Sequence, residues 1–385
     1  MNSRQRLLTT LNHQEPDRIP LDLGATQVTG IHRVAYEGLR QSLGLPPREA
    51  AICDRIQGLV LPDADVITRL GVDVRGLFPL NSHNLPAAEQ VGDGYGYWLY
   101  LDEWGITHRR PYPDGLYYSI WKEPLNQPEV TAADIINHPW PDFGAAWRIE
   151  GLRLQAETYR KAGFAVMLKD PFAGIFEMAQ RIVGMENLLM MMATDPSLAG
   201  VLFDKMAALK LDFWEMALPQ LAEVVDVISQ ADDYGSQASQ IISPRMFRQQ
   251  IKPRWQPVFN RLRELAPHAH FFFHSCGNVR PLIPDFIELG VQILNPVHIR
   301  ATGMEPTALK QDFGDALTFW GGGIDTQDML PHGTPQQVKN EVKRNIEALA
   351  PGGGYVFNTV HNIQADVPVE NILAMYEAFH EYNIY

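Results

Sequence analysis

Cysteine is scarce in this chain, whose 385 residues include only Cys53 and Cys276. Two cysteines cannot build the disulfide framework of a small secreted protein, so a reducing cytoplasm is the expected location. Long hydrophobic runs are also missing: none approaches the roughly 18 apolar residues of a membrane span. The opening segment, MNSRQRLLTTLNHQEPDR, lacks the apolar core and small-residue cleavage site of a signal peptide. These absences predict a protein without a membrane anchor or a secretory leader.

Basic residues are outnumbered, with 32 Lys and Arg against 45 Asp and Glu, which gives a net charge of −13. Nucleic acids and anionic membranes require a basic patch, so the charge argues against both as partners. The composition is 45% hydrophobic and 20% charged, which is typical of a globular protein. A chain of this length can bury a large core, as two ordinary domains or as one large α/β barrel.

Short apolar runs alternate with amphipathic stretches along most of the chain. This pattern predicts a parallel sheet covered by helices, and eight such runs fit a (β/α)8 TIM-type barrel with an N-terminal helical extension. The predicted helix over 334–350 has Thr334 as its N-cap and Pro335 at its first position. A second predicted helix covers 243–265. The eight expected strands are 18–24, 72–78, 165–170, 224–233, 270–274, 291–297, 317–323 and 355–361.

The region from about 81 to 150 interrupts this alternation. It is rich in Tyr, Trp, Gly and Pro, and its alternating aromatics and PDG turn predict β-hairpins. We interpret it as an insertion that covers one mouth of the barrel, so that residues 1–385 form a single domain.

Polar side chains follow nearly all of the expected strands, at the carboxyl ends where barrel enzymes place their functional residues. We predict Asp233, His361 and Asp232 as catalytic residues. Adjacent carboxylates on a buried strand end cost desolvation energy unless a cation meets them, and Arg75 is one candidate for that cation. For Asp170 and Asp325, capping of the following helix is an alternative of equal weight to a role in the site. The predicted substrate-binding residues are Arg75, Asp22, Tyr234, Asn295 and Asn358.

The motif HFFFHSCGNV (270–279) places His274 and Cys276 at the end of a buried strand. Side chains two residues apart on an extended strand share a face, and one imidazole with one thiolate suits Zn²⁺. A third ligand is needed, for which His298 is the preferred candidate and Asp233 and His361 are the others. The alternative is a half-buried cysteine beside a histidine that bonds to backbone. Cys53 lies in a helical-looking segment, AICDRIQGLV, and is interpreted as packing.

The sequence resembles the uroporphyrinogen decarboxylase superfamily over nearly its whole length. The most specific segments are HSCGN (274–278), GGGIDTQDMLPHGTPQQV (321–338) and LAPGGGYVFNTVHNIQADVPVENI (349–372). The resemblance implies one of two activities: decarboxylation of porphyrinogens without a cofactor, or zinc-dependent methyl transfer involving corrinoids. A homodimer is common in that superfamily.

Both branches have motifs that this chain lacks. The decarboxylases carry an arginine-bearing P-x-W-x-M-R-Q-A-G-R-Y segment, where this chain has RIPLDLGATQVTGIHRVAY with Arg33 as its only basic candidate. They also have an aspartate where this chain reads FPLN (78–81). The methyltransferases add a second cysteine in a P-G-C segment, which falls at Gly353 here.

The resemblance therefore favours a methyltransferase that moves a methyl group between a small O-methylated substrate and a corrinoid carried by a partner protein. Zinc at His274, Cys276 and His298 would polarise the departing oxygen. A cofactor-independent carboxy-lyase, using Asp233 and His361, is the first alternative. A non-catalytic protein that binds a tetrapyrrole or a partner is the second.

Overall fold

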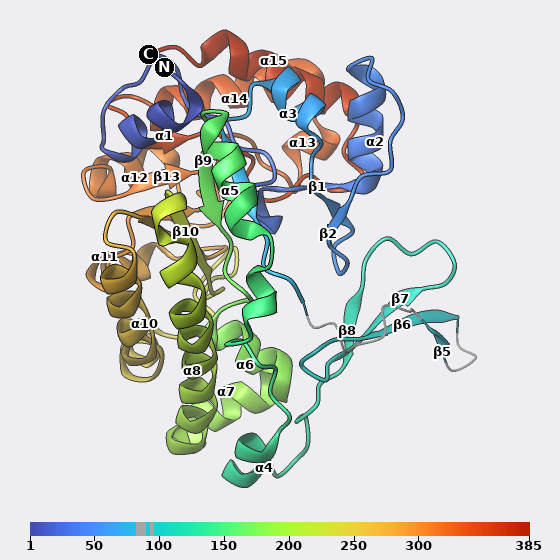
Figure 1. Cartoon of the computed structure of the whole chain (residues 1–385), viewed down its shortest axis with the longest axis vertical. Coiled ribbons are helices and arrows are strands. Elements are labelled where there is room, and N and C mark those ends of the chain that lie inside the picture. Colours follow the sequence, from blue (N-terminus) through green and yellow to red (C-terminus); the bar gives the residue numbers. More distant parts are fainter. Residues whose placement is uncertain (82–89, 93–95) are drawn as a thin grey trace.

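A curled parallel sheet forms the centre of the protein, and helices surround it (Figure 1). The structure is a computed structural model, which describes residues 1–81, 90–92 and 96–385. Seven strands pair in the order β14-β13-β12-β11-β10-β9-β4. Their bounds are β4 Val74–Leu77, β9 Ala165–Leu168, β10 Val227–Ala231, β11 His270–His274, β12 Ile293–Asn295, β13 Thr318–Trp320 and β14 Tyr355–Val356.

The segment around Leu21 closes this sheet into a barrel. Leu21 forms a parallel bridge with Phe357, directly after β14, and the Asp22 amide donates to the Phe357 carbonyl at 3.0 Å. On the other side, the Asp73 amide donates to the Leu21 carbonyl at 2.8 Å, directly before β4. The segment therefore lies between the two edge strands and completes the predicted (β/α)8 arrangement. Seven of the eight predicted strands are confirmed, and the eighth position, 18–24, contributes the single bridge at Leu21.

Alternation along the strands separates the barrel interior from the layer between sheet and helices. Ala165 and Met167 of β9 belong to the interior cluster, whereas Val166 and Leu168 join the larger outer core. Apolar side chains from many strands fill the interior, so the barrel is a packed core and not a pore. The interior cluster consists of Leu7, Leu11, Ala25, Val28, Val74, Ala165, Met167, Val227, Phe272, Ile293, Trp320 and Val356.

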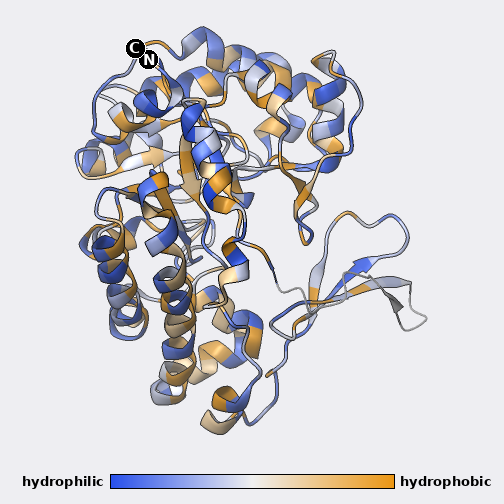
Figure 2. Ribbon diagram, viewed as in Figure 1, coloured by the Kyte–Doolittle hydropathy of each residue, from blue (hydrophilic) through white to orange (hydrophobic). Residues whose placement is uncertain are grey.

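Amphipathic helices cover the outside of the sheet, and they carry both blue and orange residues in Figure 2. The predicted cap of α14 is confirmed, because Thr334 and Gln337 form a reciprocal capping box. The predicted helix over 243–265 is α9 and α10 joined by a π-helical turn. Within the described residues, no helix is long and apolar enough to cross a membrane. The helices are α1 Ser3–Leu11, α2 Arg33–Ser42, α3 Ala64–Leu70, α4 Ala132–Asn137, α5 Leu152–Lys161, α6 Ile175–Val183, α7 Met185–Thr194, α8 Pro196–Leu221, α9 Pro244–Met246, α10 Lys252–Leu265, α11 Ile283–Leu289, α12 Pro306–Phe313, α13 Met329–His332, α14 Pro335–Leu349 and α15 Val369–Tyr382.

The hairpins expected within 81–150 form an antiparallel sheet that stands to one side of the barrel (Figure 1). Its strands are β5 Gln90–Gly92, β6 Tyr97–Leu101, β7 Thr107–Pro111 and β8 Ser119–Lys122. The insertion also includes residues 82–89 and 93–95, which lie outside the described residues.

A smaller antiparallel sheet corrects the interpretation of the Cys53 segment. It consists of β1 Ile31–His32, β3 Leu59–Val60 and β2 Ile52–Asp54, so Cys53 lies on a strand and not on a helix. The Gln57 amide donates to Asp54 at 2.9 Å, and Gly58 has a φ of 65°. This turn chemistry outweighs the helix-like spacing of the apolar residues.

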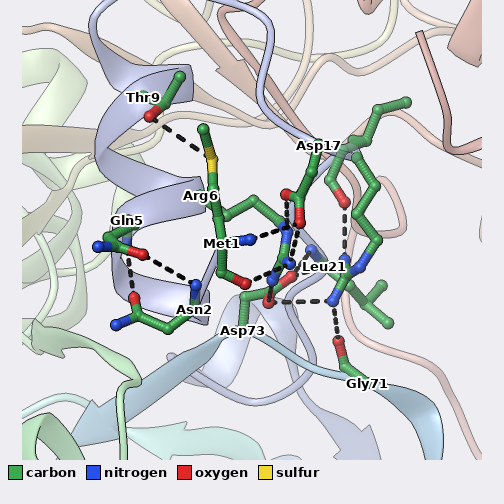
Figure 3. Close-up of polar contacts among 11 residues, drawn as sticks. Met1, Asn2, Gln5, Arg6, Thr9, Asp17, Leu21, Gly71 and Asp73 are labelled. Carbon is green, nitrogen blue, oxygen red and sulfur yellow. Dashed lines mark hydrogen bonds and ion pairs between the residues drawn. The ribbon is translucent and has the colours of Figure 1, made fainter.

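The amino ends of the strands carry a network of ion pairs, which we call the amino rim (Figure 3). Asp73, fully buried directly before β4, accepts from Arg6 at 2.7 Å and from Arg18 at 2.8 Å. Asp226 lies in the equivalent place before β10 and accepts from Arg4 at 2.8 Å. These carboxylates also accept backbone N–H groups, Asp73 from Leu21 and Asp226 from Val166. Each carboxylate of the amino rim is thus paired within the protein.

Candidate active site

His274, the last residue of β11, points into the carboxyl mouth of the barrel. Phe272, two residues earlier, belongs to the interior cluster, so His274 shares its face. Its Nδ1 atom contacts the Asn295 side-chain oxygen, and the Asn295 amide nitrogen donates to the Trp320 carbonyl at 2.7 Å. Because a carbonyl can only accept, Asn295 presents its oxygen to the ring, and Nδ1–H donates to it. In the neutral tautomer that this hydrogen bond selects, Nε2 is the acceptor nitrogen and is directed into the mouth.

Cys276 and His361 meet His274 in this mouth. The Cys276 Sγ atom lies 3.3 Å from His274 Nε2. The ligand atoms of His274, Cys276 and His361 all lie within 4.8 Å of one another. Burial and the neighbouring His274 lower the pKa of His361 to about 4, so its imidazole is neutral at pH 7. Burial and two nearby carboxylates raise the pKa of the Cys276 thiol.

Asp233 lies beside this group and has a fixed orientation. Its Oδ1 atom accepts the Cys276 amide at 2.8 Å and lies 3.7 Å from His274 Nε2. About a third of its side chain is exposed to the cavity. The structure therefore brings together four of the predicted residues: Asp233, His274, Cys276 and His361.

Asp232 and Tyr234 point the other way, into the layer between the sheet and its helices. Asp232 accepts the amides of Phe176 and Glu177 at the start of α6, at 3.0 and 2.8 Å, and also accepts the Tyr234 hydroxyl. Burial raises the pKa of Asp232 to about 7. The structure places neither residue on the cavity wall, because strand alternation turns Asp233 inward and its two neighbours outward.

Three further predicted residues do not reach the cavity either. Arg75 does not pair with Asp232 or Asp233: it follows the inward Val74, and its guanidinium packs 4.1 Å from the ring centre of Phe164. Asp22 is buried in the barrel, where it accepts the Trp320 indole N–H at 3.0 Å. Asn358 donates to the Asp22 carbonyl at 2.9 Å.

His298 lies near the site but outside the group of three. Its Nδ1 atom accepts the Gly277 amide at 3.0 Å, and its Nε2 atom lies 3.4 Å from Gln327 Oε1. Its ring therefore supports the HSCGN loop, and the group of three contains His361 and not the predicted His298. The strand-end position alone could not separate the two histidines, because each follows a barrel strand, His298 after β12 and His361 after β14.

The position of Gly353 corrects the inference of a missing ligand. Gly353 precedes β14, so it lies at the amino end of the barrel, opposite His361. Its φ is 78°, and a Cβ atom there would lie 2.5 Å from the Gln14 carbonyl oxygen. A cysteine at this position would neither fit nor reach His274. His361, at the carboxyl end of the same strand, stands where a third ligand from β14 can reach the site.

A cavity of about 1080 Å³ opens in front of these residues. Strand-end residues line one side, and the hairpin sheet lines another with Tyr100, His108 and Arg110. The sequence prediction missed two wall residues on α6, Glu177 and Arg181, which form an ion pair. Burial raises the pKa of Glu177. Their signal was present in the sequence, since they occupy an i,i+4 pair on the helix that follows a barrel strand.

Comparison with known proteins shows the family of this chain. The profile of uroporphyrinogen decarboxylase (URO-D) matches residues 156–382. A methylated-thiol–coenzyme M methyltransferase of Methanosarcina mazei is 25% identical over 270 residues, which are 68% of this chain and 67% of that protein. A uroporphyrinogen decarboxylase of Pseudoalteromonas translucida is 32% identical over 94 residues, 22% of this chain and 26% of that protein.

A solved structure, a methyltransferase from Methanosarcina mazei, has the same fold. It superposes with a TM-score of 0.61 at 18% identity and covers 99% of both chains. The profile match spans more than half of the sequence and includes His274, Cys276, Asp233 and His361. The chain belongs to the uroporphyrinogen decarboxylase family.

Proposed function

We propose that this chain is a methyltransferase that moves a methyl group between a small O-methylated substrate and the corrinoid of a partner protein. A zinc ion held by His274, Cys276 and His361 assists the reaction, and the insertion at about 81–150 covers the cavity. The observation that carries the proposal is the convergence of these three donor atoms within 4.8 Å at the cavity wall. The similarity to a methyltransferase over two thirds of the chain supports the reaction class.

The three residues fit zinc in donor type and spacing. Two imidazole nitrogens and one sulfur are ligands that zinc prefers, and a catalytic site keeps a fourth position open. Tetrahedral bonds of about 2.1 Å to nitrogen and 2.3 Å to sulfur separate two such ligands by roughly 3.5 Å. The observed Cys276–His274 separation of 3.3 Å agrees with this value. Asn295 supplies the hydrogen bond that orients a metal-binding histidine.

The residues of the site have distinct tasks in this reaction. The carbon–oxygen bond of the substrate breaks, its methyl carbon bonds to the cobalt of the reduced corrinoid, and the oxygen takes up a proton. When bound, zinc supplies a Lewis acid that lowers the basicity of the departing oxygen. Asp233 faces the cavity beside the ligands, so its Oδ2 atom carries the proton to or from that oxygen. His274 keeps its proton on Nδ1, because Nδ1–H donates a hydrogen bond to the Asn295 side-chain oxygen.

The metal content of purified protein tests the ligand set. We expect about one zinc per chain in the wild type, and loss of zinc in Cys276→Ser and in His361→Ala. His298→Ala is the matched control: it removes a nearby buried imidazole outside the proposed set, so it should retain zinc. Loss of zinc in His298→Ala but not in His361→Ala would overturn the assignment of His361.

Methyl transfer is tested with free cob(I)alamin in place of the partner protein and a panel of methoxy compounds as donors. Formation of methylcobalamin, followed by its absorption spectrum, is the expected result with zinc-loaded protein. We expect Asp233→Asn to retain zinc and to slow the transfer by about a hundredfold, the contribution typical of general acid–base catalysis. A metal-free wild type with undiminished activity would refute the role of zinc.

A carboxy-lyase is the second candidate, and the similarity to a uroporphyrinogen decarboxylase over 94 residues favours it. The same purified protein distinguishes the two candidates. Release of CO₂ from uroporphyrinogen or a smaller acid, at a rate unchanged by zinc removal, would establish the lyase instead.

A further inference from the structure

Lys169 places a positive charge in the cavity. This charge has no task in the proposed methyl transfer. It directly follows β9, and Ala165 and Met167 of that strand point into the barrel. Alternation therefore turns Lys169 inward as well, and it lines the same cavity as His274 and Asp233. Its side chain is 16% exposed, so most of it is shielded from bulk solvent.

The ammonium group of Lys169 is only partly satisfied within the protein. It donates to the Asp170 carbonyl at 2.8 Å. The remaining two N–H groups have no acceptor at hydrogen-bond distance in the described part of the chain. The nearest carboxylate oxygen, that of Asp170, lies 3.8 Å away, and the same carboxylate lies 3.5 Å from the fully buried Lys210. A partly buried ammonium with two open N–H groups is costly unless a ligand meets it.

Two neighbouring carboxylates of this wall have contacts within the protein. Glu177 pairs with Arg181, and Asp233 accepts the Cys276 amide. Lys169 differs from Arg181 of the same wall, whose charge is balanced by Glu177, because the carboxylate nearest to Lys169 is shared with Lys210. A singly charged carboxylate, with two oxygens, matches the two open N–H groups of one lysine.

We propose that Lys169 binds the carboxylate of the substrate, so that the substrate of this site is a small methylated carboxylic acid. The methyl group in this assignment rests on the proposed function, whereas carboxylate binding at Lys169 stands without it. Strand β9 lies two strands from β11, and adjacent strands are about 4.8 Å apart. Lys169 spans part of the resulting distance to His274, so the carboxylate and the methylated oxygen are separated by a few bonds or by one aromatic ring.

Binding of four probes to zinc-loaded protein tests the assignment. Methoxyacetate and para-methoxybenzoate are the acids, and methoxyethanol and para-methoxybenzyl alcohol are their neutral counterparts. Calorimetry should show that at least one acid binds about tenfold or more tightly than its neutral counterpart, the ratio expected for one charged hydrogen bond. In Lys169→Met this preference should disappear, while Lys169→Arg should keep part of it.

Lys161→Met, at the exposed end of α5, is the matched control and should bind the acids as the wild type does. Unchanged binding of the neutral probes shows that Lys169→Met is folded. If that variant does not fold, Lys169→Arg is the test, and its preference for the acids should be smaller than that of the wild type. Equal binding of acids and neutral counterparts, or no binding of either acid, would overturn the assignment. Methyl transfer from a neutral donor would then leave the proposed function standing, whereas acid binding without methyl transfer would remove only that function.

Discussion

Charged residues at the two ends of the barrel differ in whether they are paired within the protein. At the amino rim, Asp73 and Asp226 are surrounded by guanidinium groups and backbone amides, so their charges are balanced inside the protein. At the carboxyl mouth, His274, His361 and Lys169 line a cavity, and the Cys276 Sγ atom lies 3.3 Å from His274 Nε2. Polar residues with complete partners stabilise the fold, whereas those with open positions are available to a ligand.

Asp73→Ala tests the amino rim and should have the largest effect on stability. It removes the carboxylate shared by Arg6 and Arg18, so Arg6 keeps only Asp17 and the largely buried Arg18 loses its ionic partner. We expect the free energy of unfolding to fall by about 3–5 kcal/mol, measured by urea denaturation. The exposed Asp366→Ala is the matched control and should change stability by less than about 0.5 kcal/mol.

The same variant should bind zinc as the wild type does under conditions where it is folded. Loss of zinc from folded Asp73→Ala would break the division between the two rims, because it would show that the amino rim also serves the mouth.

Asp22 differs from the other charged residues of the mouth, because it is a buried carboxyl group that faces no cavity. Burial raises its pKa to about 6, above the ordinary value of 3.8. The folded protein therefore holds this proton more tightly than the unfolded chain, and the associated stability is lost as the pH rises from about 4 to about 6. The shift corresponds to about 3 kcal/mol, since one pKa unit is worth about 1.4 kcal/mol.

Asp22→Asn removes this titration while keeping a polar side chain beside Trp320. Unfolding should be measured at several pH values for both proteins. The stability of the variant relative to the wild type should increase between pH 4 and pH 7, and a difference that stays constant over this range would contradict the prediction.

Asn295→Ala tests whether fixed donor geometry distinguishes the mouth. The variant removes the acceptor that holds the Nδ1 proton of His274, so the ring can change tautomer and orientation. We expect zinc affinity to fall by about 10- to 100-fold in a chelator competition titration. Asn340→Ala, on the exposed face of α14, provides the baseline, and equal affinities for the two variants would show that Asn295 does not orient the ligand.

Periodicity was sufficient to predict the barrel but not the direction of each strand-end residue. The eight strands and the cap of α14 follow from apolar runs and turn residues, which are local signals. Asp232 and Asp233 are identical in type and adjacent in sequence, and only the register of β10 decides which one faces the cavity. A shift of one residue exchanges the two faces, and the sequence alone does not set that register to within one residue.

The ligand set needed the same three-dimensional information. His298 and His361 both follow inner strands, yet only His361 has a ring nitrogen within reach of His274 and Cys276. The P-G-C resemblance places a ligand at Gly353, but the sequence does not show that this residue lies at the amino end of β14, away from His274. Strand-end positions do not include Glu177 and Arg181, because these residues lie on helix α6.

Thr334→Ala gives the smallest expected effect and marks the limit of the comparison. Thr334 begins the helix that follows β13, so it lies on the same side of the barrel as the site. Its side chain and that of Gln337 satisfy each other's backbone amides, which completes its hydrogen bonding. Removing the cap should lower the free energy of unfolding by about 1 kcal/mol and leave zinc content and acid binding unchanged. If zinc or acid binding fell as well, position at the carboxyl end would matter more than the presence of open donor atoms.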